Sequence, residues 1–341
     1  MKLLVTGGAG FIGSAFVRTT LAGDAAVRLV NLDKLTYAGN LENLAPVEAD
    51  AAQRARYRFV QGDICDVDLV QRLMDEEKPD AIVHFAAESH VDRSIHAPAP
   101  VFETNLRGTF TLLEAARAAR IGRFVHVSTD EVYGSIEAPA EADESYPLHA
   151  SSPYSASKAG SDLLVLSYFM TYKLPVVVTR ASNNYGPYHF PEKLIPLMIS
   201  NALEGKPLPV YGDGQQIRDW LFVEDHCAAI RSVLASGREG EVYNVGGNCS
   251  LPNLEVVRRI LAGTGQPDSL IHYVADRPGH DRRYALSSEK IWHQTGWKAG
   301  MDFDRGLQLT IDWYRANANG WVARVKSGEY RNFYELNYAG R

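Results

Sequence analysis

The sequence predicts a doubly wound α/β fold, in which helices cover both faces of a parallel sheet, followed by a smaller C-terminal α/β lobe. Two observations predict this fold. Short apolar segments alternate with helical patterns over the first half of the chain, and a glycine-rich turn follows the first apolar segment. The length of 341 residues suits one large α/β domain with an attached lobe.

Six segments of the first half are predicted to be strands of the sheet. Each is rich in Val, Ile, Leu or Phe with little alternation, which is typical of strands buried on both faces. The predicted strands are Lys2–Thr6, Arg28–Asp33, Tyr57–Val60, Ala81–Ala86, Arg123–Ser128 and Val176–Arg180.

Two long helices are predicted beside these strands, Thr104–Ala119 and Tyr154–Tyr172. The polar stretch 139–153 before the second helix is expected to be a loop over the sheet edge. In the first helix, apolar residues recur at helical spacing and therefore share one face. These residues are Leu106, Phe110, Leu113 and Ala116.

The character of the sequence changes after residue 182. We therefore predict a first domain over 1–182 and a second lobe over 183–341, with some later segments returning to the first domain. Clustered prolines and glycines predict an irregular stretch with one short helix near Leu194–Glu204. The remaining predicted elements are a strand near Glu241–Val245 and helices near Asn253–Ala262 and Phe303–Ala316.

The composition excludes several classes of protein. A net charge of −6 argues against general nucleic-acid binding, which needs a basic surface, but does not exclude a small nucleotide ligand. Cys65, Cys227 and Cys249 form no C-x-x-C pair and no metal-ligand spacing, so we expect reduced thiols and no metal. Without a signal-peptide pattern or an apolar run of about 20 residues, we expect a cytoplasmic protein.

The glycine-rich turn Gly7–Gly13 predicts a Rossmann-type dinucleotide site. Gly7, Gly10 and Gly13 allow a tight turn, a pyrophosphate against bare backbone, and close packing of the helix on the strand. Asp33 ends the second predicted strand, where a carboxylate accepts hydrogen bonds from a ribose diol and repels a 2′-phosphate. This favours NAD over NADP, although the adjacent Lys34 could tolerate a phosphate.

Two further pairs of residues follow predicted strands on the same side. Asp63 and Ile64 could bracket an adenine, and the small side chains of Ala86 and Ala87 would let a dinucleotide pass close to the backbone. For each pair alone, packing or turn formation explains the residues equally well.

Tyr154 and Lys158 are four residues apart and therefore share one face of a predicted helix. A free phenol has a pKa of about 10 and is a poor base at neutral pH. A nearby ammonium group favours the phenolate, so Tyr154 can accept a proton, and Lys158 can also hold a nicotinamide ribose. Ser128 and Thr129, at the end of the fifth predicted strand, strengthen this interpretation.

The glycine turn, the Ser-Thr pair and the Tyr/Lys pair together resemble the extended short-chain dehydrogenase/reductase superfamily. Six stretches, in order along residues 1–285, further resemble one family within it, the dTDP-glucose 4,6-dehydratases. They are residues 84–94, 128–134, 183–188, 191–196, 218–220 and 276–281.

The resemblance implies an enzyme that dehydrates dTDP-glucose to its 4-keto-6-deoxy product, with NAD tightly bound and regenerated each turnover. Tyr154 then acts at the C4 hydroxyl, which Thr129 helps to hold. Elimination of water needs two further proton transfers, for which Asp130 is the implied acid and Glu131 the implied base. Outside this context, an Asp-Glu pair is more often a helix start or a solvated turn. The resemblance also implies a homodimer through the two long helices.

The resemblance extends to further binding residues. For phosphate groups it implies Lys193, Arg218 and Arg277. Additional cofactor residues would be Phe11, Ile12, Leu35, Thr36, Phe85, Ser89, Thr104, Ser128 and Asn184. Additional substrate residues would be Glu88, Ser89, Thr129, Asn183, Leu194, Pro209, Val210, Tyr211, Asn253 and His280.

Two other functions remain open at this point. A UDP-sugar 4-epimerase or decarboxylase of the same superfamily would share the cofactor and Tyr/Lys parts, but would not explain Asp130 and Glu131 together with the three basic residues. A non-catalytic NAD-sensing module could keep the glycine turn and Asp33, but has no need of the catalytic set. No function is assigned to residues 321–341.

Overall fold

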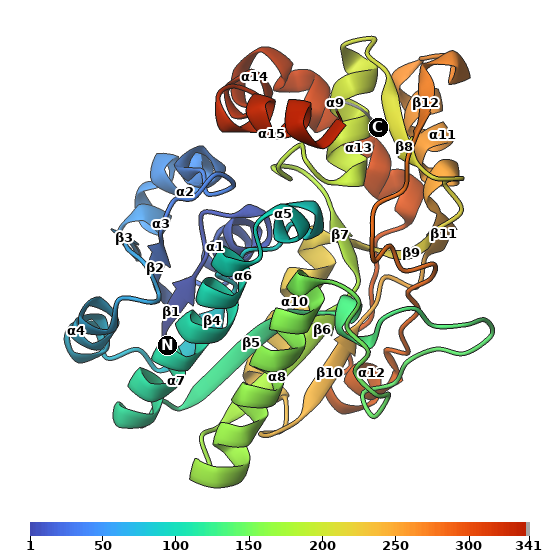
Figure 1. Cartoon of the computed structure of the whole chain (residues 1–341). Coiled ribbons are helices and arrows are strands. Elements are labelled where there is room, and N and C mark those ends of the chain that lie inside the picture. The colour runs from blue at the N-terminus through green and yellow to red at the C-terminus, as the bar shows by residue number, and fades with distance from the viewer. Residues whose placement is uncertain (339–341) are drawn as a thin grey trace.

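A parallel sheet of seven strands forms the first lobe (Figure 1). The structure is a computed structural model that describes residues 1–338. The strand order is β10-β6-β5-β4-β1-β2-β3 and all neighbouring pairs are parallel, so the predicted parallel sheet is confirmed. The strands are β1 (Lys2–Thr6), β2 (Arg28–Asp33), β3 (Tyr57–Gln61), β4 (Ala81–His84), β5 (Arg123–Thr129), β6 (Val176–Ala181) and β10 (Val242–Val245).

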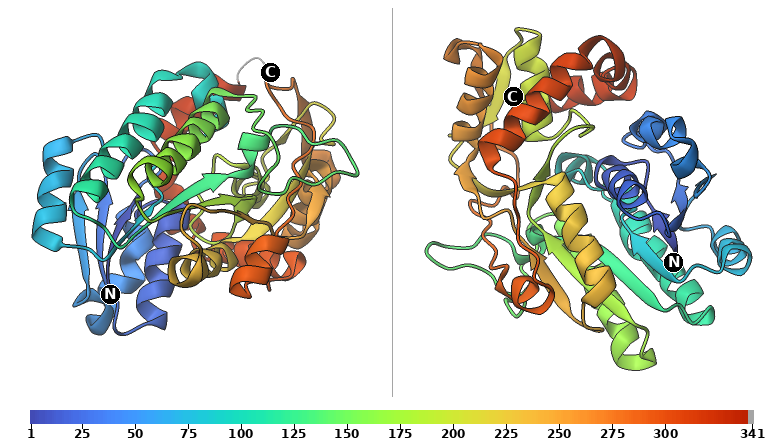
Figure 2. Two further views of the ribbon diagram at one scale, coloured as in Figure 1. Left: turned by 90° about the horizontal axis from the view of Figure 1, so that it is seen from below. Right: turned by 180° about the vertical axis from the view of Figure 1, so that it is seen from behind.

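Helices cover both faces of this sheet (Figure 2). Leu3 and Leu4, successive residues of β1, belong to two different apolar clusters, one on each side of the sheet. Burial on both sides explains why the strands are continuous apolar runs. The helices on one side are α1 (Phe11–Gly23) and α10 (Val223–Ser236), and those on the other are α4 (Val67–Glu77), α7 (Thr109–Ala118) and α8 (Pro153–Tyr172).

The predicted helix Thr104–Ala119 is not a regular α-helix throughout. A π-helical segment, η2 (Glu103–Gly108), precedes α7. The predicted apolar face is wrong at Phe110, which is 48% exposed, whereas Leu113 and Ala116 are buried. A π-helical turn holds more residues than an α-helical turn, so it rotates the face of the helix that follows.

The second lobe has an apolar core of its own. Ile199, Val257 and Ile311, from three helices, are buried in it. The stretch with clustered prolines and glycines is less irregular than predicted, because it contains the short strands β7 and β8. β7, β9 and β11 form one small sheet, and β8 and β12 another. The elements are β7 (Asn183–Tyr185), α9 (Leu194–Leu203), β8 (Leu208–Tyr211), β9 (Ile217–Phe222), β11 (Ser250–Pro252), α11 (Asn253–Thr264), β12 (Ile271–Val274) and α13 (Phe303–Ala316).

After the first strands and helix of the second lobe, the chain returns to the first lobe. α10, which was not among the predicted elements, packs against α1, and β10 pairs with β6, with Val242 opposite Val178. α12 (Glu289–Thr295) also returns, and its Ile291 is buried in the same apolar cluster as Val245 of β10. The edge of the first sheet next to β6 is therefore formed by residues that lie far beyond residue 182 in the sequence.

The C-terminal helices connect the two lobes. Trp321 is buried, and its Nε1 donates to Asn43 Oδ1 at 2.8 Å. Arg324 forms an ion pair with Glu42.

The remaining helices of residues 1–338 are η1 (Leu41–Leu44), α2 (Ala45–Ala49), α3 (Ala51–Arg54), α5 (Val91–His96), α6 (Ala99–Phe102), η3 (Asp130–Tyr133), η4 (Asp268–Leu270), η5 (Ala318–Val322), α14 (Ala323–Val325) and α15 (Glu329–Tyr338).

The described residues contain neither a membrane-spanning helix nor a cluster of metal ligands. Among residues 1–338, none of the helices combines the length and the apolar character that crossing a membrane requires. Nor does this part of the chain bring together three His, Cys, Asp or Glu side chains that could hold a metal ion. The three cysteines are free thiols.

Candidate active site

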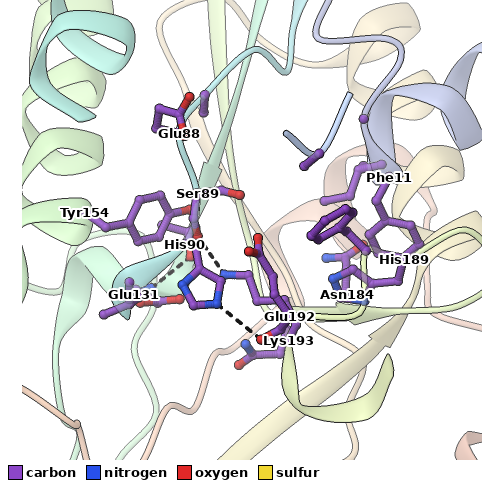
Figure 3. Close-up of a pocket in the computed structure, with 18 of the residues that line it drawn as sticks. Phe11, Glu88, Ser89, His90, Glu131, Tyr154, Asn184, His189, Glu192 and Lys193 are labelled. Carbon is purple, nitrogen blue, oxygen red and sulfur yellow. Dashed lines mark hydrogen bonds between the residues drawn. The ribbon is translucent and has the colours of Figure 1, made fainter. Parts of the chain in front are cut away.

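A cleft of about 380 Å³ lies between the lobes, beside the carboxyl ends of the parallel strands (Figure 3). The strand order reverses there, between β1 and β4, which is where open α/β sheets bind ligands. The residues predicted for cofactor, substrate and catalysis all line this cleft, with the exception of Leu35. Leu35 instead lines a neighbouring cavity with Thr36 and Tyr37.

The glycine turn forms a cradle of bare backbone at the start of α1. Gly7 has a φ of 73°, and a Cβ there would lie 2.6 Å from the backbone nitrogen of Ala86. A Cβ on Gly13 would lie 2.2 Å from the carbonyl oxygen of Gly7. Gly10, the N-cap of α1, lines the cleft. Backbone N–H groups at such a helix start bind phosphate groups, so the cradle fits a diphosphate.

Asp33 lies at the end of β2, next to this cradle. Its carboxylate accepts hydrogen bonds from the backbone nitrogens of Ala9 and Leu35, both at 2.8 Å. Burial raises the pKa of Asp33, and these two hydrogen bonds oppose the rise. Lys34 forms an ion pair with Asp63 at 2.6 Å, so its charge already has a partner. The arrangement suits a ribose diol better than a 2′-phosphate.

Thr129, Asp130 and Glu131 lie together at the end of β5. The Thr129 hydroxyl accepts from the backbone nitrogen of Glu131 and donates to Asp130 Oδ1, both at 3.3 Å. Asp130 is 2% exposed. Burial, and then the charges of Glu131 and Asp219, raises the pKa of Asp130 well above its ordinary value. Glu131 is only partly buried, and two adjacent carboxyl groups that differ in burial can divide the roles of acid and base.

Tyr154 is positioned by the start of α8. Ser152 Oγ accepts from the backbone nitrogen of Ser155 at 3.1 Å, and Ser155 Oγ accepts from that of Ser152 at 3.0 Å. This reciprocal pair is a capping box, which fixes the first turn of a helix. Tyr154 follows Pro153 in that turn, and Figure 3 shows it on the same side of the cleft as Glu131.

Tyr154 and Lys158 are both buried, and each has a shifted pKa. Burial, and then the charge of Glu131, raises the pKa of Tyr154, while a hydrogen bond with Thr129 lowers it. Burial lowers the pKa of Lys158 to about 8. Lys158 Nζ donates to the carbonyl oxygen of Val127 at 2.9 Å, which directs the ammonium group toward the cleft wall that Tyr154 also lines.

Three cationic side chains line the part of the cleft that the second lobe forms, and two of them bind backbone carbonyls. Lys193 Nζ donates to the carbonyl oxygen of Ser89 at 2.7 Å. One Arg218 terminal nitrogen donates to the carbonyl oxygen of Asp281 at 2.9 Å. Because these partners are carbonyls rather than carboxylates, the positive charges stay available to an anionic ligand.

The third cation, Arg277, forms a buried ion pair with Asp92 at 3.0 Å. Burial alone would raise the pKa of Asp92, but Arg277 and His90 hold it at about 2. Asp92 Oδ2 also accepts from Tyr211 Oη at 2.9 Å and from Asn337 Nδ2 at 3.3 Å. The C-terminal helix α15 therefore contributes to this end of the cleft.

Several residues of the cleft were not predicted. The ring of His189 stacks on that of Phe11, with centroids 4.0 Å apart and an interplanar angle of 7°. Tyr338 of α15 stacks on Tyr211, with centroids 6.0 Å apart. Asp92 lies in residues 84–94, one of the stretches that carry the resemblance, and could have been identified from that stretch. Tyr338 lies in the segment to which no function was assigned, and no sequence signal indicated it.

Buried polar atoms without a protein partner gather along the cleft. Such atoms are uncommon in folded proteins. Together with the glycine cradle and Asp33, they fit a dinucleotide and a second polar ligand. Among residues 1–338, those that line the cleft include Ser128 Oγ, Asp130 Oδ2, Asn183 Oδ1, Asn253 Oδ1 and Arg277 Nε.

A dinucleotide cradle at the reversal of strand order, with a Tyr/Lys pair on the helix after β5, defines an extended short-chain dehydrogenase/reductase. A family model described as GDP-mannose 4,6 dehydratase matches residues 4–310. The chain belongs to this family of nucleotide-sugar 4,6-dehydratases, and the resemblance seen in its motifs is confirmed.

Curated relatives share about half of their residues with this chain. The dTDP-glucose 4,6-dehydratase of Shigella flexneri is 52% identical over 100% of both chains. That of Xanthomonas campestris pv. campestris strain B100 is 54% identical over 96% of this chain and 97% of its own.

Solved structures agree with these relatives. DesIV, a dTDP-glucose 4,6-dehydratase from Streptomyces venezuelae with NAD and TYD bound, has a TM-score of 0.91 at 52% identity, over 96% of this chain and 100% of its own. The UDP-glucose 4-epimerase of Thermus thermophilus, in complex with NAD, has a TM-score of 0.85 at 32% identity, over 92% of this chain and 99% of its own. The epimerase is the more distant of the two.

Proposed function

We propose that this protein is an NAD-dependent dehydratase that converts dTDP-glucose to dTDP-4-keto-6-deoxy-glucose. The observation that carries the proposal is the pair Asp130 and Glu131, which stands in the cleft beside Tyr154 with one carboxyl buried and protonation favoured. An epimerase needs a base at C4 but no acid and base for elimination across C5–C6. The high identity to named dTDP-glucose 4,6-dehydratases supports the same choice.

The first step oxidises the sugar at C4. NAD, which Gly7, Gly10, Gly13 and Asp33 would hold, would supply the acceptor for the hydride of C4 and the donor that later reduces C6. Tyr154 takes the proton of the C4 hydroxyl, Thr129 holds that oxygen by a hydrogen bond, and the Lys158 ammonium favours the phenolate. The resulting C4 ketone makes the hydrogen at C5 acidic.

The second step eliminates water across C5 and C6. Glu131 removes the C5 proton while Asp130 gives a proton to the departing C6 oxygen. Burial favours the protonated form of Asp130, so a proton is available at that position before the bond to oxygen breaks. A proton then returns to C5 when C6 is reduced.

The second lobe holds the nucleotide in this proposal. Lys193, Arg218 and Arg277 bind the diphosphate, since guanidinium and ammonium groups are its natural partners. The thymidine end lies near Tyr211 and His280, whose rings meet edge to face with centroids 5.9 Å apart. The remaining contacts come from Glu88, Ser89, Asn183, Leu194, Pro209, Val210 and Asn253, all of which line the cleft.

The first lobe holds the cofactor. Residues 1–182, completed by the returning α10 and β10, carry the dinucleotide site and the catalytic groups. Gly7, Gly10 and Gly13 receive the pyrophosphate, Asp33 the adenosine ribose, and Lys158 the nicotinamide ribose. Further contacts come from Phe11, Ile12, Lys34, Thr36, Asp63, Ile64, Phe85, Ala86, Ala87, Ser89, Thr104, Ser128, Tyr154 and Asn184, while Leu35 contributes its backbone nitrogen to Asp33.

The protein forms a homodimer in this proposal, through the outer faces of α7 and α8. Phe110 of α7 and Leu163 and Met170 of α8 are 48%, 60% and 69% exposed. Exposed apolar side chains gathered on neighbouring helices are typical of an interface. Leu163→Lys is expected to shift the protein to monomer in sedimentation velocity. An unchanged dimer would place the interface elsewhere.

The cytoplasm is the proposed location. The three free thiols, one of them buried, are typical of a protein that stays in a reducing compartment. Localisation of a tagged chain in cell fractions tests this assignment.

The decisive experiment is incubation of the purified protein with dTDP-glucose and no added NAD. The alkali-stable absorbance of a 4-keto-6-deoxy sugar is expected, because the cofactor is retained and regenerated. A parallel incubation with UDP-glucose tests whether the enzyme distinguishes thymine from uracil in the nucleotide. In tritiated water, tritium is expected at C5 of the product. Absence of product even with NAD supplied would overturn the proposal in favour of an epimerase or decarboxylase.

A further inference from the structure

A buried chain of polar side chains runs from Lys158 into the first lobe. His126 Nε2 lies 3.4 Å from Lys158 Nζ and 3.5 Å from Asp162 Oδ1. Asp162 Oδ2 accepts a hydrogen bond from Arg180 Nε at 2.8 Å. His126 and Asp162 are both 0% exposed, so water screens these charges little.

Arg180 is fixed at its other end as well. One of its terminal nitrogens donates to Tyr133 Oη at 2.9 Å, and Tyr133 Oη donates to Asn244 Oδ1 at 2.8 Å. Asn244 belongs to β10, the strand that returns to the first sheet. The position of Arg180, and through it that of Asp162, therefore depends on both β6 and β10.

This series of buried side chains contains two cations, Lys158 and Arg180, and one carboxylate, Asp162. Burial lowers the pKa of Lys158 to about 8, and Asp162 opposes that change. Burial would raise the pKa of Asp162, but His126, Arg180 and Lys158 together hold it below its ordinary value. Asp162 is therefore ionised, with Arg180 on β6 as its hydrogen-bonded partner and the charge of Lys158 one turn away on its own helix.

The other titratable groups facing Lys158 from the neighbouring elements are neutral at pH 7. His84 on β4 and His126 on β5 both have pKa values lowered by burial, and further by neighbouring positive charge. Tyr154, on the same helix as Lys158, has a pKa raised by burial, so it can accept a proton only where the positive charges of Lys158 and of bound NAD offset that rise. The charged groups that face Lys158 from the interior are therefore Asp162 and Arg180.

We propose that Asp162 is a positioning residue whose negative charge, beside His126 and one helical turn from Lys158, keeps Lys158 charged beside Tyr154, and that Arg180 limits this effect by sharing the carboxylate. The inference rests on the proposed function, since it concerns the step in which Tyr154 takes a proton. The Lys158 ammonium favours the phenolate, so turnover declines at high pH when Lys158 loses its proton.

Substitution of the two ion-pair partners predicts opposite shifts of the pH profile. Asp162→Asn removes the negative charge and keeps the shape, so the alkaline limb of kcat moves to lower pH, by about one pH unit. Arg180→Gln removes the competing positive charge and keeps a donor, so the alkaline limb moves to higher pH. A purely structural role would lower kcat in both variants without moving their limbs in opposite directions.

Ser161→Ala is the matched control. Ser161 Oγ lies 3.2 Å from the same His126 nitrogen but carries no charge, so the alkaline limb should stay in place. Bound NAD and the thermal midpoint of each variant are measured in parallel, to separate a change of charge from loss of cofactor or fold.

The possible outcomes all decide the inference. If Asp162→Asn does not fold, Arg180→Gln decides alone, and a limb that stays or moves to lower pH overturns the inference. Wild-type protein that fails to convert dTDP-glucose would overturn the proposed function itself. Wild-type turnover with variants that do not shift in opposite directions would overturn only the role of Asp162.

Discussion

The two sides of the cleft are built in different ways. The side proposed for the cofactor contains a cradle of bare backbone, the turn Gly7–Gly13, beside the strand ends of a single sheet. The side proposed for the substrate contains long cationic side chains, such as Arg218 and Arg277, each held by a group from a distant segment. A site made of backbone atoms takes its shape when the sheet folds. A site made of side chains can instead be altered by substitution of one residue at a time.

Asp130 lies where the two sides meet, and its substitution should have the largest effect. Asp130→Asn keeps the shape but removes the proton donor, so kcat for dTDP-glucose should fall by about 10² to 10⁴. Bound NAD should remain at the wild-type level, because no part of the glycine cradle changes. Turnover close to wild type would remove Asp130 from the elimination step.

On the cofactor side, one added methyl group in the glycine turn should be enough to weaken NAD binding. Gly13→Ala places a Cβ 2.2 Å from a backbone oxygen, which must cost about 1–3 kcal/mol or displace the turn. NAD affinity should fall by up to about 100-fold, as measured by cofactor retained on purification and by titration. Gly23→Ala, at the other end of α1 with open space around it, should leave NAD binding unchanged.

On the substrate side, the response should be graded. Arg277→Gln removes a charged hydrogen-bond donor worth about 1.5–3 kcal/mol, so KM for dTDP-glucose should rise about 10- to 100-fold. NAD retention should not change. The matched control is Arg282→Gln, which breaks an exposed ion pair with Asp213 and should leave KM near its original value. Equal effects of the two variants would contradict a specific role for Arg277.

The same substitution should lower stability near neutral pH and weaken its dependence on acid. Asp92 has a pKa of about 2 in the folded protein, below its value of about 3.9 in an unfolded chain. Its ion pair therefore stabilises the fold above about pH 4, and this contribution is lost as the pH falls toward 2. In Arg277→Gln the Asp92 pKa rises toward its unfolded value, so the variant should be less stable than wild type above about pH 4, and this difference in urea unfolding should shrink as the pH falls toward 2. Identical pH profiles would show that the pair adds no stability.

Lys34 should give the smallest effect of all. Its ion pair with Asp63 is exposed, and such pairs contribute about 0–1 kcal/mol. Lys34→Ala should change the free energy of unfolding by less than about 1 kcal/mol and leave the preference for NAD over NADP intact. A fall in NADP binding would show instead that Lys34 offers its charge to a 2′-phosphate.

The sequence predicted the strands and helices around the glycine turn well because their signals are local. A buried parallel strand, a glycine turn and a helix follow one another without interruption, and Asp33 ends the next strand. The Tyr154/Lys158 pair depends only on helical spacing. In these segments each prediction concerned a few consecutive residues, so no long-range contact had to be inferred.

The parts that were missed depend on contacts between distant segments. Asn337 and Tyr338 meet Asp92 and Tyr211 only because α15 lies across the second lobe, and no local pattern encodes that packing. A strand at 241–245 and a return of some later segments to the first domain were expected, but the pairing of β10 with β6 is invisible in residues 242–245 alone. The exposure of Phe110 depends on a π-helical turn, which helical periodicity cannot distinguish from an α-helical one.

The place of β10 also has a consequence for synthesis of the chain. Domains generally fold from the N-terminus as they leave the ribosome. Here the sheet has an open edge at β6 until residue 245 has emerged, because β10 covers that edge and α10 covers the adjoining apolar face. A ribosome stalled before that point holds a nascent chain with an unpaired strand, the kind of surface on which chaperones act.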